Sequence, residues 1–179
     1  MGIALGDGNL SNPNGRAVRL RITCDKKYPL IVENIIKNLK IIFTQNKISI
    51  TDRVNALDIC IYSNDLEKIL GWGAKGGSKI KQKVGVPSWI KENKVYRKEC
   101  LRGLFQTDGS IYSDRGYKMV NFTSVCYTLI RDIEDMLQEI GFAIKARKVL
   151  DIKKNRVKYI IRISKNVEKF IKIINFWKL

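Results

Sequence analysis

The chain has 179 residues, and 45% of them are hydrophobic, which is enough for a packed core. It carries 34 Lys and Arg against 17 Asp and Glu, a formal charge of +17, and such an excess favours a polyanionic partner. It contains no histidine, which excludes Ser-His-Asp hydrolases, Cys-His proteases and nucleases that need a histidine base.

The cysteines and the hydropathy pattern bear on the cellular location of the protein. The four cysteines are scattered and form no Cys-x-x-Cys pair, which argues against a zinc site and for reduced thiols. No apolar run approaches the length of a membrane span, and no signal peptide or lipidation motif is present at the N-terminus. We therefore expect no membrane partner and an intracellular protein, in the cytoplasm of a prokaryote or in an organelle.

In chain order, the first feature is a short apolar segment that ends in Asp-Gly, and the second half of the chain repeats it. The first copy is Gly2-Ile-Ala-Leu-Gly-Asp-Gly8, and the second is Leu101-Arg-Gly-Leu-Phe-Gln-Thr-Asp-Gly109. Each copy has small residues four positions apart, which would let two helices pack closely. The repeat suggests two halves that each bring one aspartate, Asp7 or Asp108, to a pseudo-two-fold axis.

The elements that follow each aspartate also repeat. Turn residues and alternating runs predict a hairpin, an apolar stripe predicts a helix, and two further strand-like runs and a last helix follow. The predicted stripes are Ile31, Ile35, Leu39 and Ile42 in one half, and Ile130, Ile133, Leu137 and Ile140 in the other. Both halves therefore read α-β-β-α-β-β-α, which predicts an α+β fold.

The two Asp-Gly motifs, the repeated element order and the segment Val86-Pro-Ser-Trp-Ile90 before the second motif resemble the LAGLIDADG homing endonucleases in their single-chain, two-motif form. The resemblance implies two pseudo-symmetric repeats with saddle-shaped antiparallel sheets, joined through the motif helices. We expect an N-terminal repeat at 1–75, a basic linker at 76–95 and a C-terminal repeat at 96–179. The first motif helix is shorter than the second, and we expect it to be truncated.

The same resemblance implies the catalytic residues. Asp7 and Asp108 would act in catalysis and, with the carbonyls of Gly6 and Thr107, would bind metal. The cofactor would be Mg²⁺, with Ca²⁺ as a non-cleaving substitute and Mn²⁺ as a further option, because hard cations prefer oxygen ligands. Lys26 would support the active-site water network. The alternative for an Asp beside Gly is a helix cap or a turn.

The strands carry the prediction of DNA contacts. Arg, Lys and Asn can read base edges in the major groove, which admits a β-ribbon, and we expect the arginine-bearing first strand to have no acidic neighbour on its outer face. The alternative for any single residue is an ordinary solvated sheet face. The predicted DNA-binding residues are Arg16, Arg19, Arg21, Thr23, Ser49, Thr51, Arg53, Lys75, Lys79, Lys118, Asn121, Thr123, Lys145, Arg147, Arg156, Lys158 and Arg162.

These features favour an intron-encoded, monomeric endonuclease that makes a double-strand break in a long DNA site by metal-dependent phosphodiester hydrolysis. Two alternatives stay open. One is an intron maturase that binds intron RNA, and the other is a noncatalytic DNA-binding protein on the same fold.

Overall fold

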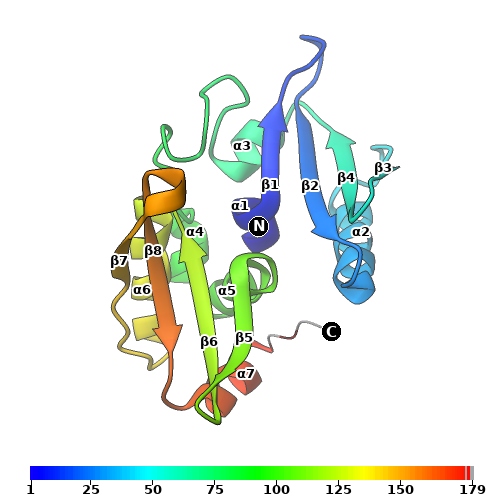
Figure 1. Cartoon of the computed structure of the whole chain (residues 1–179). Coiled ribbons are helices and arrows are strands. Elements are labelled where there is room, and N and C mark those ends of the chain that lie inside the picture. Colours follow the sequence, from blue (N-terminus) through cyan, green and yellow to red (C-terminus); the bar gives the residue numbers. More distant parts are fainter. Residues whose placement is uncertain (176, 178–179) are drawn as a thin grey trace.

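The computed structural model describes residues 1–175 and 177, except for the side chain of Lys153. The chain forms two halves with the same order of elements (Figure 1). The first half contains α1 (Gly2–Asp7), β1 (Gly8–Ser11), β2 (Arg19–Asp25), α2 (Pro29–Ile42), β3 (Ser49–Asp52), β4 (Ala56–Tyr62) and α3 (Leu66–Leu70).

The second half starts with a short additional helix and then repeats this order. Its elements are α4 (Ser88–Glu92), α5 (Lys94–Asp108), β5 (Gly109–Asp114), β6 (Tyr117–Ser124), α6 (Tyr127–Glu139), β7 (Arg147–Asp151), the 3-10 turn η1 (Ile152–Lys154), β8 (Arg156–Ile163) and α7 (Val167–Ile174). The predicted α+β class and the repeated α-β-β-α-β-β-α order are confirmed. Within the described part of the chain, no helix has both the length and the apolar character needed to cross a membrane.

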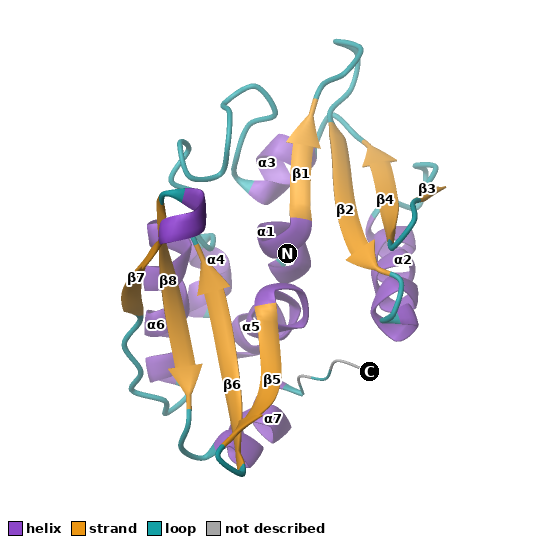
Figure 2. Ribbon diagram, viewed as in Figure 1, coloured by secondary structure: helices purple, strands orange, loops and turns teal. Residues whose placement is uncertain are grey.

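Each half has one four-stranded antiparallel sheet, and the two sheets have equivalent strand orders. These orders are β1-β2-β4-β3 and β5-β6-β8-β7. The long helices α2 and α6 cover one face of their sheets, and the motif helices α1 and α5 lie between the halves (Figure 2). The other sheet face in each half is left for polar side chains, because residues alternate between the two faces of a strand.

The core follows this alternation. Leu20, Ile22, Ile59 and Ile61 line the inner face of the first sheet, and all are buried. In the second half, the ring of Phe105 on α5 lies 5.2 Å from that of Phe122 and 4.9 Å from that of Phe170, measured between centroids. This aromatic cluster fixes α5 against its sheet and against α7.

The helical stripes are mostly as predicted. Ile130, Ile133 and Leu137 are fully buried and Ile140 is partly buried, while all but the last member of the first stripe are buried. The prediction that Ile42 belongs to the buried stripe is wrong, because its side chain is 60% exposed. Ile42 is the last residue of α2, and the following residue, Phe43, packs against the core instead.

The two motif helices pack with their backbones in close approach. A Cβ atom added to Gly2 would lie 2.0 Å from the carbonyl oxygen of Cys100, and one added to Gly103 would lie 2.7 Å from the amide nitrogen of Ile3. No larger residue fits at either position without movement of the backbone. The small residues of the motifs therefore allow α1 and α5 to meet, as their spacing predicts.

Candidate active site and nucleic-acid interface

The packing of the motif helices brings their C-terminal ends together. A Cβ atom on Gly6 would lie 2.1 Å from Oγ1 of Thr107 and 3.0 Å from Oδ2 of Asp108. The carboxylate of Asp108 therefore lies directly against the end of the first motif, next to Asp7. The charges of Asp108 and Asp7 both act on the ammonium of Lys79, so each half contributes one carboxylate to this region.

The oxygen atoms at this place suit a hard divalent cation. Carboxylates and backbone carbonyls are the ligands that Mg²⁺ prefers, and Mg²⁺ needs only one or two carboxylates when waters and phosphate oxygens complete its shell. Among the described residues, no cluster of three or more His, Cys, Asp or Glu could hold a metal by itself. Waters or further oxygen atoms would therefore have to complete the shell of an ion bound here.

The nearby thiol offers no competing soft ligand. Burial, and after it the charges of Asp7 and Asp58, raise the pKa of Cys24 to about 12, so this side chain is a neutral thiol at neutral pH. All four cysteines are buried and free, as expected for reduced thiols. The ligand atoms available to a metal at the motif ends are therefore oxygens.

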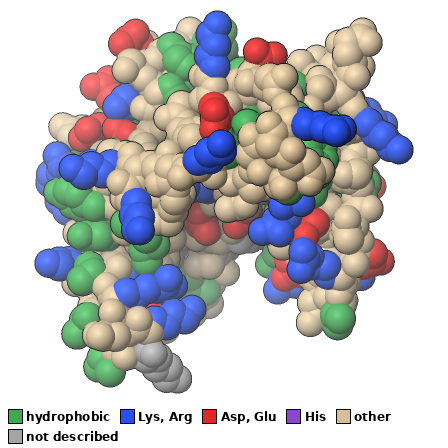
Figure 3. Space-filling model, turned by 90° about the horizontal axis from the view of Figure 1, so that it is seen from above, with side chains coloured by type: hydrophobic (Ala, Val, Ile, Leu, Met, Phe, Trp, Pro, Cys, Tyr) green, Lys and Arg blue, Asp and Glu red, His purple; other side chains and the backbone are tan. Residues whose placement is uncertain are grey.

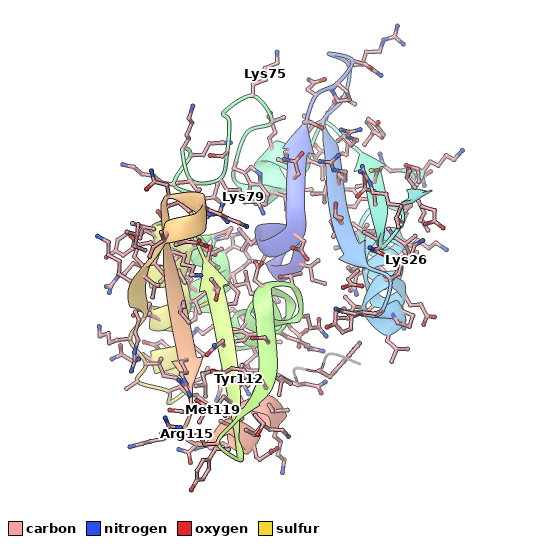
Figure 4. The ribbon with its side chains drawn as sticks, viewed as in Figure 1. Lys26, Lys75, Lys79, Tyr112, Arg115 and Met119 are labelled. Carbon is pink, nitrogen blue, oxygen red and sulfur yellow. The ribbon has the colours of Figure 1, made fainter. Side chains whose placement is uncertain are left out.

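Lys79 makes an unexpected contact with the first motif. Its ammonium donates hydrogen bonds to the carbonyls of Ala4 (3.0 Å), Leu5 (2.6 Å) and Gly6 (2.7 Å). Burial lowers the pKa of Lys79 to about 8, against the opposing effect of the nearby charges of Asp108 and Asp7. A residue predicted to contact DNA thus points into the protein, towards a predicted metal ligand (Figure 4).

A pocket adjoins Asp7 on the side of the first half. It is lined by Asp7, Cys24, Asp25, Lys27, Tyr28, Ile31, Ile35, Gln106 and Thr107. The lysine in this lining is Lys27 and not Lys26, which forms an ion pair with Asp52 on β3. The ammonium of Lys27 lies 3.0 Å from the carboxylate of Asp25, and this hydrogen-bonded pair raises the pKa of Lys27.

Gln106 is a second polar residue of this pocket that the sequence reading missed. Its side chain is buried, and its Nε2 donor has no partner among the described residues. Buried amide donors are normally hydrogen-bonded, so this one is available for a water or a substrate oxygen. The available signal was its place in the second motif, directly before Thr107 and Asp108.

On the first sheet, the predicted DNA contacts share the outer face. Pairing puts Arg19 and Arg21 of β2 opposite Tyr62 and Cys60 of β4, and Thr23 opposite Asp58. Ser49 and Thr51 of β3 pair with Cys60 and Asp58, so they point the same way. The members of this face are therefore Arg19, Arg21, Thr23, Ser49 and Thr51 of the predicted set, together with Asp58.

Asp58 corrects the expectation that this face has no acidic neighbour. Its carboxylate is almost fully buried and accepts hydrogen bonds from Oγ1 of Thr23 and Nε of Arg53, both at 2.7 Å. Burial favours the neutral acid, but these hydrogen bonds and the charges of Arg53 and Arg21 outweigh it and lower the pKa of Asp58. Thr23 and Arg53 are thus already engaged within the protein.

On the second sheet, strand register divides the predicted residues between two faces. Asn121 and Thr123 of β6 pair with Arg162 and Ile160 of β8, and the outer face also holds Arg147, Arg156 and Lys158. Lys118 has the opposite phase along β6 and forms an ion pair of 2.8 Å with Glu168 of α7. It therefore lies on the helix-covered side of the sheet, away from Asn121 and Thr123.

The outer face of the second sheet also contains residues that the sequence reading left out. The hydroxyl of Tyr112 on β5 donates to Oδ1 of Asn121 at 3.2 Å, and Arg162 pairs with Asp114 and lies over the Tyr112 ring. Met119 lies beside Tyr112 by strand pairing (Figure 4). The alternation of inner and outer residues along each strand could have identified Tyr112 and Met119 as outer-face residues.

The remaining predicted contacts are in loops. Arg16, Lys75 and Lys145 are all exposed, and Lys75 points away from its loop into solvent (Figure 4). Seen from above, Lys and Arg side chains are spread over both halves of the molecule (Figure 3). This distribution suits a partner that spans both halves.

Comparison with known proteins agrees with this architecture. Residues 95–175 match the LAGLIDADG-like domain family. This part of the chain is a LAGLIDADG domain. The whole chain resembles the crystal structure of I-DmoI in complex with DNA and Mn, with a TM-score of 0.68 and 17% identity, over 99% of this chain and 94% of that one. At this identity the likeness shows the fold, which is that of a homing endonuclease with two LAGLIDADG motifs.

The fold is also found in other proteins. Full-length DUF199/WhiA from Thermatoga maritima matches 99% of this chain and 54% of its own, with a TM-score of 0.63 and 14% identity. The replication factor C small subunit of Methanocaldococcus jannaschii is 30% identical over 204 residues, covering 94% of this chain and 11% of that protein. The chain spans about a tenth or less of the curated relatives it matches, so their activities are not transferred to it.

Proposed function

We propose that the chain is a site-specific, metal-dependent DNA endonuclease that makes a double-strand break. The observation that carries the proposal is the close packing of the two motif helices, which puts the Asp108 carboxylate against Gly6, the residue before Asp7, in a protein with a net charge of +17. The I-DmoI structures with DNA and Mn, with target DNA in the presence of Mg, and with DNA and Ca support divalent cations as cofactors. The protein would act as a monomer inside the cell.

In this proposal each half of the protein cleaves one strand of the DNA duplex. Asp7 with the Gly6 carbonyl, and Asp108 with the Thr107 carbonyl, would hold divalent ions at the two scissile phosphates. Such an ion lowers the pKa of a bound water and stabilises the leaving oxygen. Lys27 and the Nε2 donor of Gln106 line the pocket beside Asp7, where they can orient water or a phosphate oxygen.

The outer sheet faces would provide target recognition. Phosphate contacts by exposed loop residues such as Arg16, Lys75 and Lys145 would give affinity. Side chains on the strands, Arg19 and Arg21 in one half and Asn121 and Arg162 in the other, would read base edges. A long, nearly asymmetric target follows, because the two faces differ in sequence.

The test is cleavage of a plasmid that carries a duplex selected for binding. Linear product is expected with Mg²⁺, binding without cleavage with Ca²⁺, and no cleavage in EDTA. Cleavage that persists in EDTA would contradict the metal-carboxylate mechanism.

Noncatalytic DNA binding is the second candidate, and one observation favours it: the Lys79 ammonium already contacts the Gly6 carbonyl. Specific binding with no cleavage in Mg²⁺ or Mn²⁺ would select this candidate. A third role, as an intron maturase, would require stimulation of intron splicing, which a splicing assay measures.

A further inference from the structure

Lys79 lies between the two halves in sequence and connects them in space. Its side chain reaches the carbonyls of Ala4, Leu5 and Gly6 at the end of α1, with the ammonium 5.5 Å from the centre of the Trp72 ring. Its own carbonyl lies 3.9 Å from Sγ of Cys126, a residue of the second half. The lysine therefore fixes the first motif from a segment that is anchored on the second.

The end of α1 has a physical need for such a group. The last carbonyls of a helix have no partner within it, and they carry the negative end of the helix dipole. A helix of six residues is not stable by itself, because so few hydrogen bonds form within it that they do not offset the unfavourable free energy of nucleation. The Ala4 carbonyl accepts from the amide of Gly8, and the Lys79 ammonium supplies hydrogen bonds to the carbonyls of Leu5 and Gly6, which stabilises the helix end.

The same ammonium lies where a divalent ion would be bound. It contacts the Gly6 carbonyl at 2.7 Å, and the negative charges of Asp7 and Asp108 act on it. A divalent ion on that carbonyl would therefore sit next to a positive charge, and like charges at such short distances repel each other.

We propose that Lys79 is a positioning residue that acts as a resident cation of the first motif: it holds the Gly6 carbonyl and Asp7 in place before metal arrives, and it weakens metal binding there. This inference rests on the proposed function, since it concerns the same metal site. It implies that the two scissile phosphates differ in the Mg²⁺ concentration that each requires.

The experiment measures Tb³⁺ binding to the free protein by luminescence excited through tryptophan, with Ca²⁺ as a competitor. Tb³⁺ is a hard cation, and Trp72 lies close enough to the site to excite it. Lys79→Met removes the charge, Lys79→Arg keeps it, and Lys75→Met is the matched control, because it removes an exposed charge from the same segment.

Lys79→Met should bind Tb³⁺ tighter, on the order of tenfold, because a neighbouring positive charge is lost. Lys79→Arg should bind like the parent chain, and Lys75→Met should change the affinity little because solvent screens its charge. In the metal-free state, Lys79→Met should melt at a lower temperature than Lys79→Arg or Lys75→Met. If the role of Lys79 were only structural, Lys79→Met would lower the melting temperature but would not tighten metal binding.

Unchanged or weaker Tb³⁺ binding by folded Lys79→Met would overturn the inference. If that variant fails to fold, Lys79→Gln, which keeps a donor without the charge, is judged by the same criterion. A Tb³⁺ signal that survives in the Asp7→Asn, Asp108→Asn double variant would instead refute the proposed metal site itself, so the two failures are distinct.

Discussion

The two motif helices end in the same Asp-Gly pair, but they are held in place by different means. Helix α5 has fifteen residues, an Asn93 side-chain cap on two amides, and a buried face that includes Phe105. Helix α1 has six residues and no side-chain cap at its start, and it depends on Lys79 and on contact with α5. The comparison teaches that the same Asp-Gly helix end can be positioned by its own helix or by contacts from elsewhere in the fold.

The largest expected effect concerns the aspartates themselves. Asp108→Asn keeps the size of the side chain but removes the charge, and a carboxamide is a poorer Mg²⁺ ligand. Cleavage of the selected site should fall by about a thousandfold or more, as for loss of a major electrostatic group, while binding of the duplex survives. The measurement is single-turnover cleavage beside a binding titration in Ca²⁺.

Asp135→Asn is the matched control, because it removes an exposed carboxylate on α6. Asp7→Asn should act like Asp108→Asn if α1 is positioned as well as α5. Full activity of Asp108→Asn would remove the aspartates from the mechanism.

The contact between α1 and α5 should be nearly as sensitive. Gly103→Ala places a Cβ 2.7 Å from a backbone nitrogen of α1, which cannot move like a flexible side chain. Overpacking of this kind typically costs 1–3 kcal/mol, and we expect about 3 kcal/mol in the free energy of unfolding because backbone must shift. Urea unfolding measures it.

Gly73→Ala is the control, because the nearest atom to its added Cβ would lie 3.5 Å away. Equal stability of the two variants would show that α1 and α5 are less tightly packed than described. A lower cleavage rate in Gly103→Ala would connect this packing with the placement of the aspartates.

The two sheet faces give a third comparison. Asp58 is buried and accepts from Thr23 and Arg53, whereas Asp114 pairs with Arg162 where its side chain is 41% exposed. At pH 7, Asp58→Ala should cost roughly 2 kcal/mol of unfolding free energy, since it removes the hydrogen bonds that a buried carboxylate accepts from Thr23 and Arg53, whose own side chains stay in contact with water. Asp114→Ala should cost less than about 1 kcal/mol, as exposed ion pairs do.

The pH dependence follows from the lowered pKa of Asp58 in the folded state. A group with a depressed folded pKa stabilises the fold above its unfolded pKa, about 3.9 for Asp, and this contribution is lost as pH falls through the folded value. The stability difference between the parent chain and Asp58→Ala should therefore shrink below about pH 4. A difference that stays constant to pH 2 would contradict the ionised, hydrogen-bonded carboxylate.

The sequence was sufficient for the repeat but not for every contact at the site. Hydrophobic periodicity and turn residues are local signals, so both halves and their sheets could be predicted. Asp58 could have been found too, because strand alternation puts it in phase with Cys60 and Tyr62 on the outer face.

The role of Lys79 had no local signal. It contacts carbonyls more than seventy positions earlier in the chain, and nothing in a glycine-rich segment fixes where a lysine points. The position of Lys27, rather than Lys26, in the lining of the pocket had no clear signal for a related reason. Where β2 ends decides which neighbour faces the pocket, and strand ends are poorly marked in sequence.

The smallest effects should separate the two faces of the second sheet. Arg156 is exposed on the outer face, whereas Lys118 has the inner phase and pairs with Glu168. Arg156→Ala should reduce the slope of log affinity against log salt by about 1 if the arginine meets a phosphate, whereas Lys118→Ala should leave it unchanged. Titrations of the selected duplex at several salt concentrations measure both slopes. An equal loss in the two variants would mean that DNA reaches around the edge of the sheet to the helix-covered side, and that strand register does not decide which side chains contact it.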